Sequence, residues 1–157
     1  MTTQKALPRR AGERPSTGSP VHAQLDQNGP AELRQELWRR MTALAGVRPG
    51  RSHVSLPQSQ ALHLDPALAT GPDDAYLAGT EFAHLHGVGD GSLHVMLPPQ
   101  LATEVIAKGW AEHHPLVGRG YLPGTAVMLY SPRDDDELDV VWRLVLRSHA
   151  YARGDAA

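Results

Sequence analysis

Three histidines are spaced so that they can meet on one face of a β-hairpin. His84 and His86 lie two residues apart in a segment that alternates apolar and polar residues, and His94 lies in a second such segment after the glycine-rich turn 87–91. A short turn of this kind between alternating segments is typical of a hairpin. Side chains alternate between the two faces of a strand, so the three imidazoles share a face if residue 84 pairs with residue 94. Such a cluster can transfer protons near neutral pH or bind a metal ion.

The same pairing places further side chains around the histidines. If residue 86 pairs with 92 and residue 82 with 96, the histidine face also carries Phe82, Ser92 and Met96, which we expect to contact a substrate. Glu81 falls on the opposite face of an ideal strand, and it is structural unless a β-bulge turns it inward.

Three more candidates follow the hairpin. His114 precedes Pro115, which holds it extended in a loop, and loops on a rigid scaffold often carry function. Lys108 and Trp110 flank the glycine at the expected end of a helix. A cation there is stabilised by the helix dipole, and an aromatic ring can cover the last turn. These structural roles therefore compete with a catalytic lysine and a substrate-contacting tryptophan.

Hydrophobic periodicity and turn residues predict the elements that position these side chains. One helix is expected from Pro30 to Gly46, and a second from Pro98 to Gly109. The predicted strands are His53–Leu56, Ala61–Leu64, the two hairpin segments Glu81–His86 and Ser92–Met96, and the apolar run Thr125–Tyr130.

A third helix completes an α+β fold. Ser131 is expected as its N-cap, and the acidic run Asp134–Glu137 lies at its positive end. The element order α-β-β-β-β-α-β-α predicts a mainly antiparallel sheet with helices packed on one face. Residues 30–153 are expected to form a single domain. Residues 1–29 are rich in Pro, Gly, Ser and Thr and are predicted to be a disordered tail.

Composition excludes several classes of protein. The chain has 157 residues, a net charge of −2 and no basic and aromatic stripe, so nucleic acid is not an expected partner. It has no cysteine, which excludes disulfides and thiolate metal sites. No apolar run is long enough to span a bilayer, and no signal-peptide pattern follows Arg9 and Arg10. We therefore expect a cytoplasmic protein that does not associate with membranes.

From Glu81 to Tyr151 the chain resembles the luciferase of bioluminescent fungi and the bacterial proteins that share its domain. The spacing is kept without a gap from Glu81 to Gly118. The matching residues are Glu81, Ala83, His84, His86, Asp90, Leu93, His94, Glu104, Val105, Lys108, Gly109, Trp110, His114, Pro115, Leu116, Gly118, Leu129, Tyr130, Pro132, Arg133, Val140 and Val141.

The resemblance implies a specific chemistry. Fungal luciferase oxidises a hydroxylated pyrone with molecular oxygen, without a metal, flavin or other bound cofactor, and carbon dioxide is lost as light is emitted. This chain differs in having a shorter stretch between Gly118 and Thr125 and no membrane segment like that of the fungal enzymes. A shared domain does not fix the substrate, so light emission is not expected to carry over.

These observations lead to one hypothesis with two alternatives. The chain is expected to be a cofactor-independent, oxygenase-like oxidoreductase that acts on a small enolisable aromatic or pyrone-type compound, with molecular oxygen as co-substrate. The candidate catalytic residues are His84, His86, His94, His114 and Lys108. In the first alternative, His84, His86 and His94 bind Zn, Fe or Cu. In the second, the protein is a small-molecule binding module without catalysis.

Overall fold

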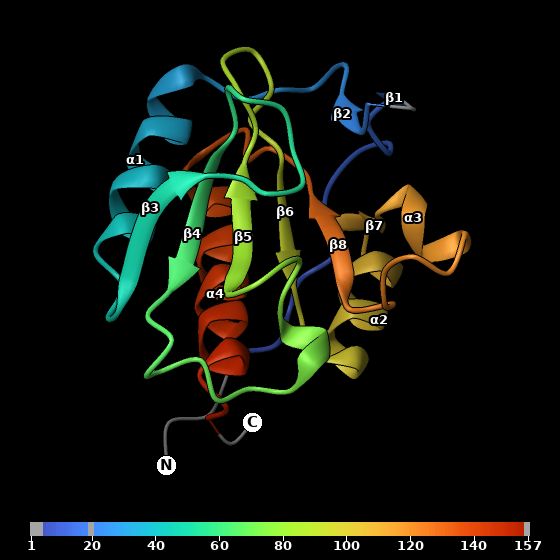
Figure 1. Cartoon of the computed structure of the whole chain (residues 1–157). Coiled ribbons are helices and arrows are strands. Elements are labelled where there is room, and N and C mark those ends of the chain that lie inside the picture. The colour runs from blue at the N-terminus through green and yellow to red at the C-terminus, as the bar shows by residue number, and fades with distance from the viewer. Residues whose placement is uncertain (1–4, 19–20, 156–157) are drawn as a thin grey trace.

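The computed structural model describes residues 5–18 and 21–155. An antiparallel sheet of six strands forms its centre, in the order β3-β4-β5-β6-β8-β7 (Figure 1). Its strands are β3 (Val47–Arg51), β4 (Gln60–Leu64), β5 (Glu81–Leu85), β6 (Leu93–Met96), β7 (Ala111–His113) and β8 (Ala126–Leu129). A second sheet pairs β1 (Thr17–Gly18) with β2 (Ala23–Gln24). The predicted α+β class and antiparallel sheet are confirmed.

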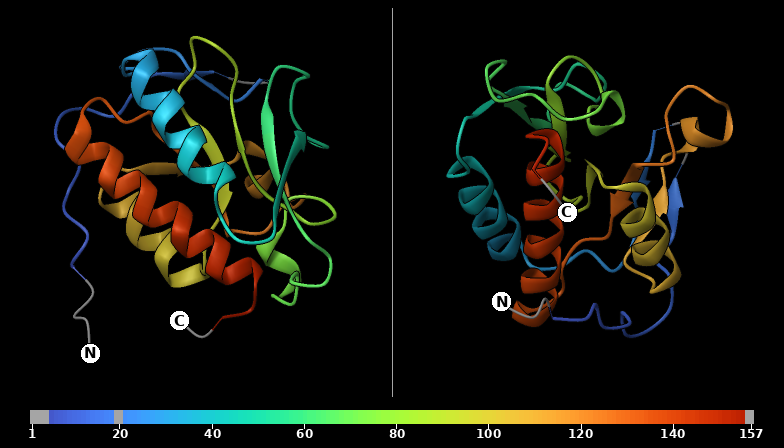
Figure 2. Two further views of the ribbon diagram at one scale, coloured as in Figure 1. Left: turned by 90° about the vertical axis from the view of Figure 1, so that its left-hand side faces the viewer. Right: turned by 90° about the horizontal axis from the view of Figure 1, so that it is seen from below.

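Helices cover one face of the large sheet. The long helix α4 (Asp135–Ala152) packs on β5 and β6, and α1 (Ala31–Thr42) lies beside it (Figure 2). The helix α2 (Pro99–Ala107) packs near β7 at the far edge. Two short helical segments are η1 (Asp73–Ala75) and α3 (Pro115–Gly118). None of the helices in the described ranges is both long and apolar enough to cross a membrane.

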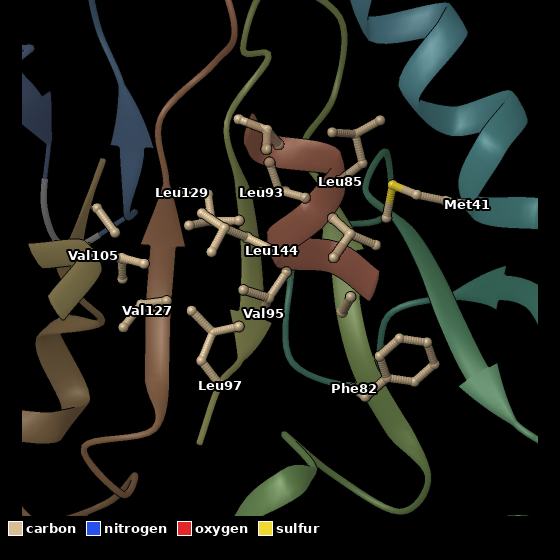
Figure 3. Packing of buried hydrophobic residues seen from close by; sticks show 14 of the residues in the cluster. Met41, Phe82, Leu85, Leu93, Val95, Leu97, Val105, Val127, Leu129 and Leu144 are labelled. Carbon is tan, nitrogen blue, oxygen red and sulfur yellow. The ribbon is translucent and has the colours of Figure 1, made fainter. Parts of the chain in front are cut away.

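The main hydrophobic core lies between this helix layer and the sheet (Figure 3). Leu85, Leu93 and Val95 point from the hairpin toward Leu144 of α4, and Met41 of α1 closes one side. Because side chains alternate along a strand, His84 and His94 must point to the other face of the sheet. The predicted pairing of residue 84 with residue 94 is present.

A β-bulge at the start of β5 changes which side chains face the histidines. Leu62 pairs with Ala83 and His63 with Glu81, so Phe82 has no partner in β4. The extra residue turns Phe82 into the main core, where its ring centroid lies 5.8 Å from that of His149. The prediction that Phe82 lies on the histidine face is therefore wrong. The same bulge turns Glu81 onto that face.

Some predicted elements differ from the structure. The strand predicted at His53–Leu56 instead covers Val47–Arg51, although this segment contains Pro49. Because β3 is an edge strand with a single neighbour, a proline is tolerated there. The short elements β7 and α3 were not predicted. Asp134, not Ser131, is the N-cap of α4, because its carboxylate accepts the Glu137 N–H at 2.8 Å.

The prediction of a disordered tail over residues 1–29 is wrong for the residues that the structure describes; residues 1–4, 19 and 20 lie outside them. This N-terminal arm, residues 5–18 and 21–29, lies against the domain. The Trp110 Nε1–H donates to the Pro8 carbonyl at 2.6 Å, and Lys108 Nζ donates to the Leu7 carbonyl at 2.7 Å. Composition alone misses this packing because it rests on individual polar side chains, such as the buried Gln24.

Candidate functional site

A cavity of about 630 Å³ opens on the face of the sheet opposite α1 and α4. Histidines from β5 and β6 form its floor, and the loop 54–59, the hairpin turn and the N-terminal arm form its walls. Its lining residues are Val21, His22, Ala23, Val54, Ser55, Leu56, Gln58, Ser59, His84, His86, Gly87, Val88, Asp90, His94, His114, Pro115, Leu116, Arg119 and Leu122. Its volume is within the range of small-molecule binding sites.

Three buried histidines meet at this floor. His84 Nε2 lies 3.0 Å from His94 Nδ1, and His86 Nε2 lies 2.9 Å from the same atom. His84 lies on β5 and His94 on β6, His86 directly follows β5, and each of the three residues is at most 6% exposed. We call these three nitrogens, His84 Nε2, His86 Nε2 and His94 Nδ1, the inner nitrogens.

The outer ring nitrogens of the same histidines contact acidic or hydroxyl groups. His84 Nδ1 lies 2.8 Å from Glu81 Oε2, the carboxylate that the bulge turns inward. His86 Nδ1 lies 2.8 Å from Ser92 Oγ and 3.3 Å from Asp90 Oδ2. Ser92 Oγ in turn donates to Asp90 Oδ1, so the hydroxyl accepts from the imidazole.

A fourth histidine extends this network into the N-terminal arm. His22 Nδ1 lies 2.8 Å from His94 Nε2, and His22 Nε2 lies 2.8 Å from Glu112 Oε2 on β7. Glu112 also accepts from Arg14, Thr17 and Tyr130, so one carboxylate ties the arm to the sheet. Figure 1 shows β1 and β2 above β7, on the same side of the molecule.

The carboxylates around the cluster are ionised at neutral pH. Burial opposes ionisation of Glu81, but hydrogen bonds from His84, the His53 N–H and Ser52 outweigh it and hold the Glu81 pKa below its ordinary value. Burial also opposes ionisation of Glu112, but hydrogen bonds, mainly from His22 and Arg14, outweigh it and lower the Glu112 pKa to about 2. Asp90 also has a lowered pKa, because hydrogen bonds from His86 and Ser92 outweigh its burial.

Because these carboxylates are ionised, the ring nitrogen that carries the proton can be assigned for each histidine. An ionised carboxylate only accepts hydrogen bonds, so the outer nitrogen of His84 carries its proton. The same reasoning applies to His86, through Ser92 and Asp90. When His22 is neutral, it donates to Glu112 and accepts from His94 Nε2. In that state all three inner nitrogens carry lone pairs.

Burial favours the neutral form of His84 and His94. It lowers the pKa of His84, although Glu81 partly offsets this effect. The pKa of His94 is held well below its ordinary value by burial and by four neighbouring histidines, His84, His86, His114 and His22. Protonation of His94 is therefore costly unless the resulting charge is shared with a partner.

His114 lies at the wall of the cavity, where the resemblance predicted a candidate. Its ring centroid lies 4.7 Å from that of His94. Its Nδ1 accepts the Leu116 N–H at 3.1 Å and caps α3, so its Nε2 carries the proton in the neutral form. Burial, together with nearby histidines, lowers the pKa of His114 to about 4. His114 thus presents an N–H donor at neutral pH.

The structure separates the predicted site residues into two groups. The cavity is lined by His84, His86, His94 and His114. Ser92 contacts the outer nitrogen of His86, on the side away from the inner nitrogens. Met96 instead packs with Leu77 and Ala126 in a separate small cluster.

The other predicted residues lie away from the cavity. Phe82 is in the main core, and Lys108 and Trp110 bind the N-terminal arm at the end of α2. The competing structural interpretation of Lys108 and Trp110 thus fits their contacts.

Sequence reasoning missed His22 and Glu112 as members of the site. His22 lies in the segment predicted to be disordered, and nothing in its local sequence distinguishes it. Glu112 lies in the unpredicted strand β7. A partial signal existed for Glu81, because only a bulge could bring it to the histidine face.

Comparisons with known proteins give a consistent result. A family model described as a luciferase domain matches residues 79–148. The luciferase of Armillaria mellea is 32% identical over 169 residues, which cover 96% of this chain and 63% of that protein. The luciferase of Neonothopanus nambi is 38% identical over 96 residues, which cover 59% of this chain and 36% of that protein. The chain thus spans less than two thirds of the length of these relatives. No solved structure matches it.

Proposed function

We propose that this chain is an oxygen-dependent oxidoreductase acting on a small enolisable compound, because a luciferase domain model matches residues 79–148 and the luciferase of Armillaria mellea is 32% identical to it. The homology supports a luciferase-like function, and the aromatic or pyrone class of the substrate follows from the family resemblance. The supporting observation is that the three inner nitrogens meet at the floor of a cavity large enough for such a compound.

The walls of the cavity suit a largely apolar molecule. Val21, Val54 and Leu56 are each about half exposed there, and Val88 in the hairpin turn is 98% exposed. Arg119 adds one permanent positive charge to this lining. An aromatic or pyrone ring can pack against the apolar walls while its acidic hydroxyl group reaches the histidines below.

The first chemical step is loss of the enolic proton. An inner nitrogen with a free lone pair can accept this proton, which produces an imidazolium and a substrate enolate. The carboxylates of Glu81, Asp90 and Glu112, on the outer side, stabilise the positive charge. In this proposal the N–H of His114, which lines the same cavity, donates to the enolate oxygen.

Oxygen then acts as the oxidant. The enolate transfers one electron to molecular oxygen, giving a substrate radical and superoxide. These combine to form a carbon–oxygen bond, and the peroxide anion takes back the proton from the imidazolium. The net change is addition of one molecule of oxygen to the substrate as a hydroperoxide, so both electrons come from the substrate.

Oxygen uptake by the purified protein tests this proposal. Protein without an affinity tag is supplied with a panel of hydroxylated pyrones and phenolic enols, and oxygen is followed with an electrode. Wild type should consume oxygen with at least one of them. His84→Ala should abolish the uptake, and the variant of the exposed His113 (His113→Ala) should retain it. Binding of these compounds without oxygen consumption contradicts the proposal and supports a non-catalytic binding module.

A further inference from the structure

The inner nitrogens form an arrangement that a positive charge between them would stabilise. Each carries a lone pair when its imidazole is neutral, and two of the three separations are 3.0 Å and 2.9 Å. One donor nitrogen from each histidine lies within 4.8 Å of the other two. Lone pairs at these distances repel each other unless a proton or a metal ion lies between them. One proton has one covalent partner and is shared unevenly among three acceptors, whereas a metal ion can bind all three.

The spacing is close to that of a three-histidine metal site. Zn–N bonds of 2.0–2.1 Å in tetrahedral geometry place ligand nitrogens about 3.3 Å apart. The two short separations reach this value by side-chain shifts of a few tenths of an ångström. Imidazole nitrogen is a good ligand for zinc, copper, iron and nickel.

The outer contacts are those that ligating histidines need. Metal-bound histidines generally donate their second N–H to a carboxylate, a carbonyl or water, which fixes the ring and makes it more basic. Here His84 donates to Glu81, and His86 contacts Ser92 and Asp90. His94 reaches Glu112 through His22. Every imidazole of the cluster is thus backed by a carboxylate, directly or through one intermediary.

Charge balance supports the same conclusion. Glu81 is fully buried, and its only ion-pair partner within the described ranges is His84. A buried carboxylate is costly without a nearby positive charge. A cation at His84 Nε2 supplies that charge through the imidazole ring. Asp90 adds a second negative charge beside His86, whereas Glu112 is already paired with Arg14; a divalent ion offsets the charges of Glu81 and Asp90 better than one proton does.

We infer that His84, His86 and His94 bind one divalent first-row transition-metal ion through the inner nitrogens, with a further position open to the cavity. The sequence favours a protein without a cofactor, with this metal site as the alternative, and the outer contacts support the alternative. The role of the ion rests on the proposed function. With the ion bound, the inner nitrogens are ligands and no longer bases, so the ion would replace the imidazolium of the proposed mechanism: it would stabilise the enolate from the open position, and the substrate proton would leave to solvent.

Zinc binding by the purified chain tests the inference. Protein made without an affinity tag is analysed for bound metal, stripped with a chelator and titrated with Zn²⁺ by calorimetry. One ion per chain at micromolar concentration or below is expected. His94→Ala should lose it, Glu81→Gln should weaken it about 10- to 100-fold, and the control His113→Ala should bind as the wild type does. Circular dichroism of each variant shows whether it is folded. If His94→Ala unfolds, Glu81→Gln still tests the site, because it retains all three ligands.

The outcomes separate this inference from the proposed function. Wild-type protein that binds no Zn²⁺ at micromolar concentration overturns the metal site, and so does a folded His94→Ala that binds as wild type does. Oxygen uptake that persists in metal-free protein also overturns the assigned role of the ion but leaves the proposed function standing. Stoichiometric zinc without any oxygen uptake in the metal-loaded protein overturns the proposed function and leaves the site.

Discussion

Glu81 and His84 are three residues apart on one strand, yet Glu81 Oε2 lies 2.8 Å from His84 Nδ1. In a regular strand, residues at i and i+3 point to opposite faces of the sheet. The contact exists because Phe82 is the extra residue of a bulge, which turns Glu81 to the histidine side and Phe82 to the core side. A local irregularity of the sheet thus supplies the carboxylate that orients a site histidine.

Removing this carboxylate should destabilise the fold. Glu81 accepts from Ser52 Oγ, the His53 N–H and His84 Nδ1, and all three donors lose their acceptor in Glu81→Ala. Of the three donors only His84 is buried, and an unsatisfied buried donor costs about 1–3 kcal/mol, so we expect a loss of about 1–3 kcal/mol in the free energy of unfolding in urea. Glu104→Ala, which removes an exposed pair with Lys108, should cost less than about 1 kcal/mol. Equal stability of the two variants would show that the bulge does not depend on Glu81.

The parts of this arrangement that follow from local sequence patterns could be predicted, and the parts that depend on contacts between distant segments could not. The alternation of His84, His86 and His94 across a glycine-rich turn is a local pattern, and it predicted the pairing of residues 84 and 94 correctly. The bulge is not local, because it is set by the register of β5 against β4. His22 lies 72 residues from His94 along the chain, in a segment of ordinary linker composition. Only the folded structure brings such residues together.

The N-terminal arm should be sensitive to one added methyl group. A Cβ at Gly29 would lie 1.8 Å from the Pro132 carbonyl oxygen and 2.9 Å from the Pro132 carbonyl carbon. Backbone cannot yield as a flexible side chain does, so Gly29→Ala should force the arm away and cost about 1–3 kcal/mol. Trypsin should then cleave faster after Arg9 and Arg10, whereas Arg14 precedes Pro15 and is not a trypsin site. A Cβ at Gly118 meets no atom within 4 Å, so Gly118→Ala is the control and should leave both stability and cleavage unchanged. Unchanged cleavage in Gly29→Ala would contradict the observed packing of the arm.

Acid should remove a defined contribution of Glu137 to stability. Burial raises the pKa of Glu137, but hydrogen bonds from Arg133 outweigh it, so the pKa in the folded protein lies below the ordinary value of 4.5. A group with a lowered folded-state pKa stabilises the fold above its unfolded-state pKa and loses that contribution as the pH falls through the folded-state pKa.

Unfolding in urea from pH 7 to pH 3 measures this effect. The stability difference between wild type and Glu137→Gln should be constant near neutral pH and should shrink as the pH drops below about 4.5. Asp139→Asn, at an exposed position on the same helix, serves as the matched control. A difference for Glu137→Gln that is the same at pH 3 and pH 7 would show that its ionic contact with Arg133 adds no pH-dependent stability.

A charge at the mouth of the cavity should weaken substrate binding and spare the chemical step. Val88 lines the cavity and is 98% exposed, so Val88→Glu removes no core contact and should fold normally. An apolar substrate that covers Val88 would lose about 1.5 kcal/mol of contact, which corresponds to about a tenfold rise in KM. The inner nitrogens are untouched, so kcat should change less than twofold in the oxygen-uptake assay. Tyr121→Glu places the same charge at an exposed residue that does not line the cavity, and its KM should stay that of the wild type. A KM equal to that of the wild type in Val88→Glu would contradict contact between the substrate and the hairpin turn.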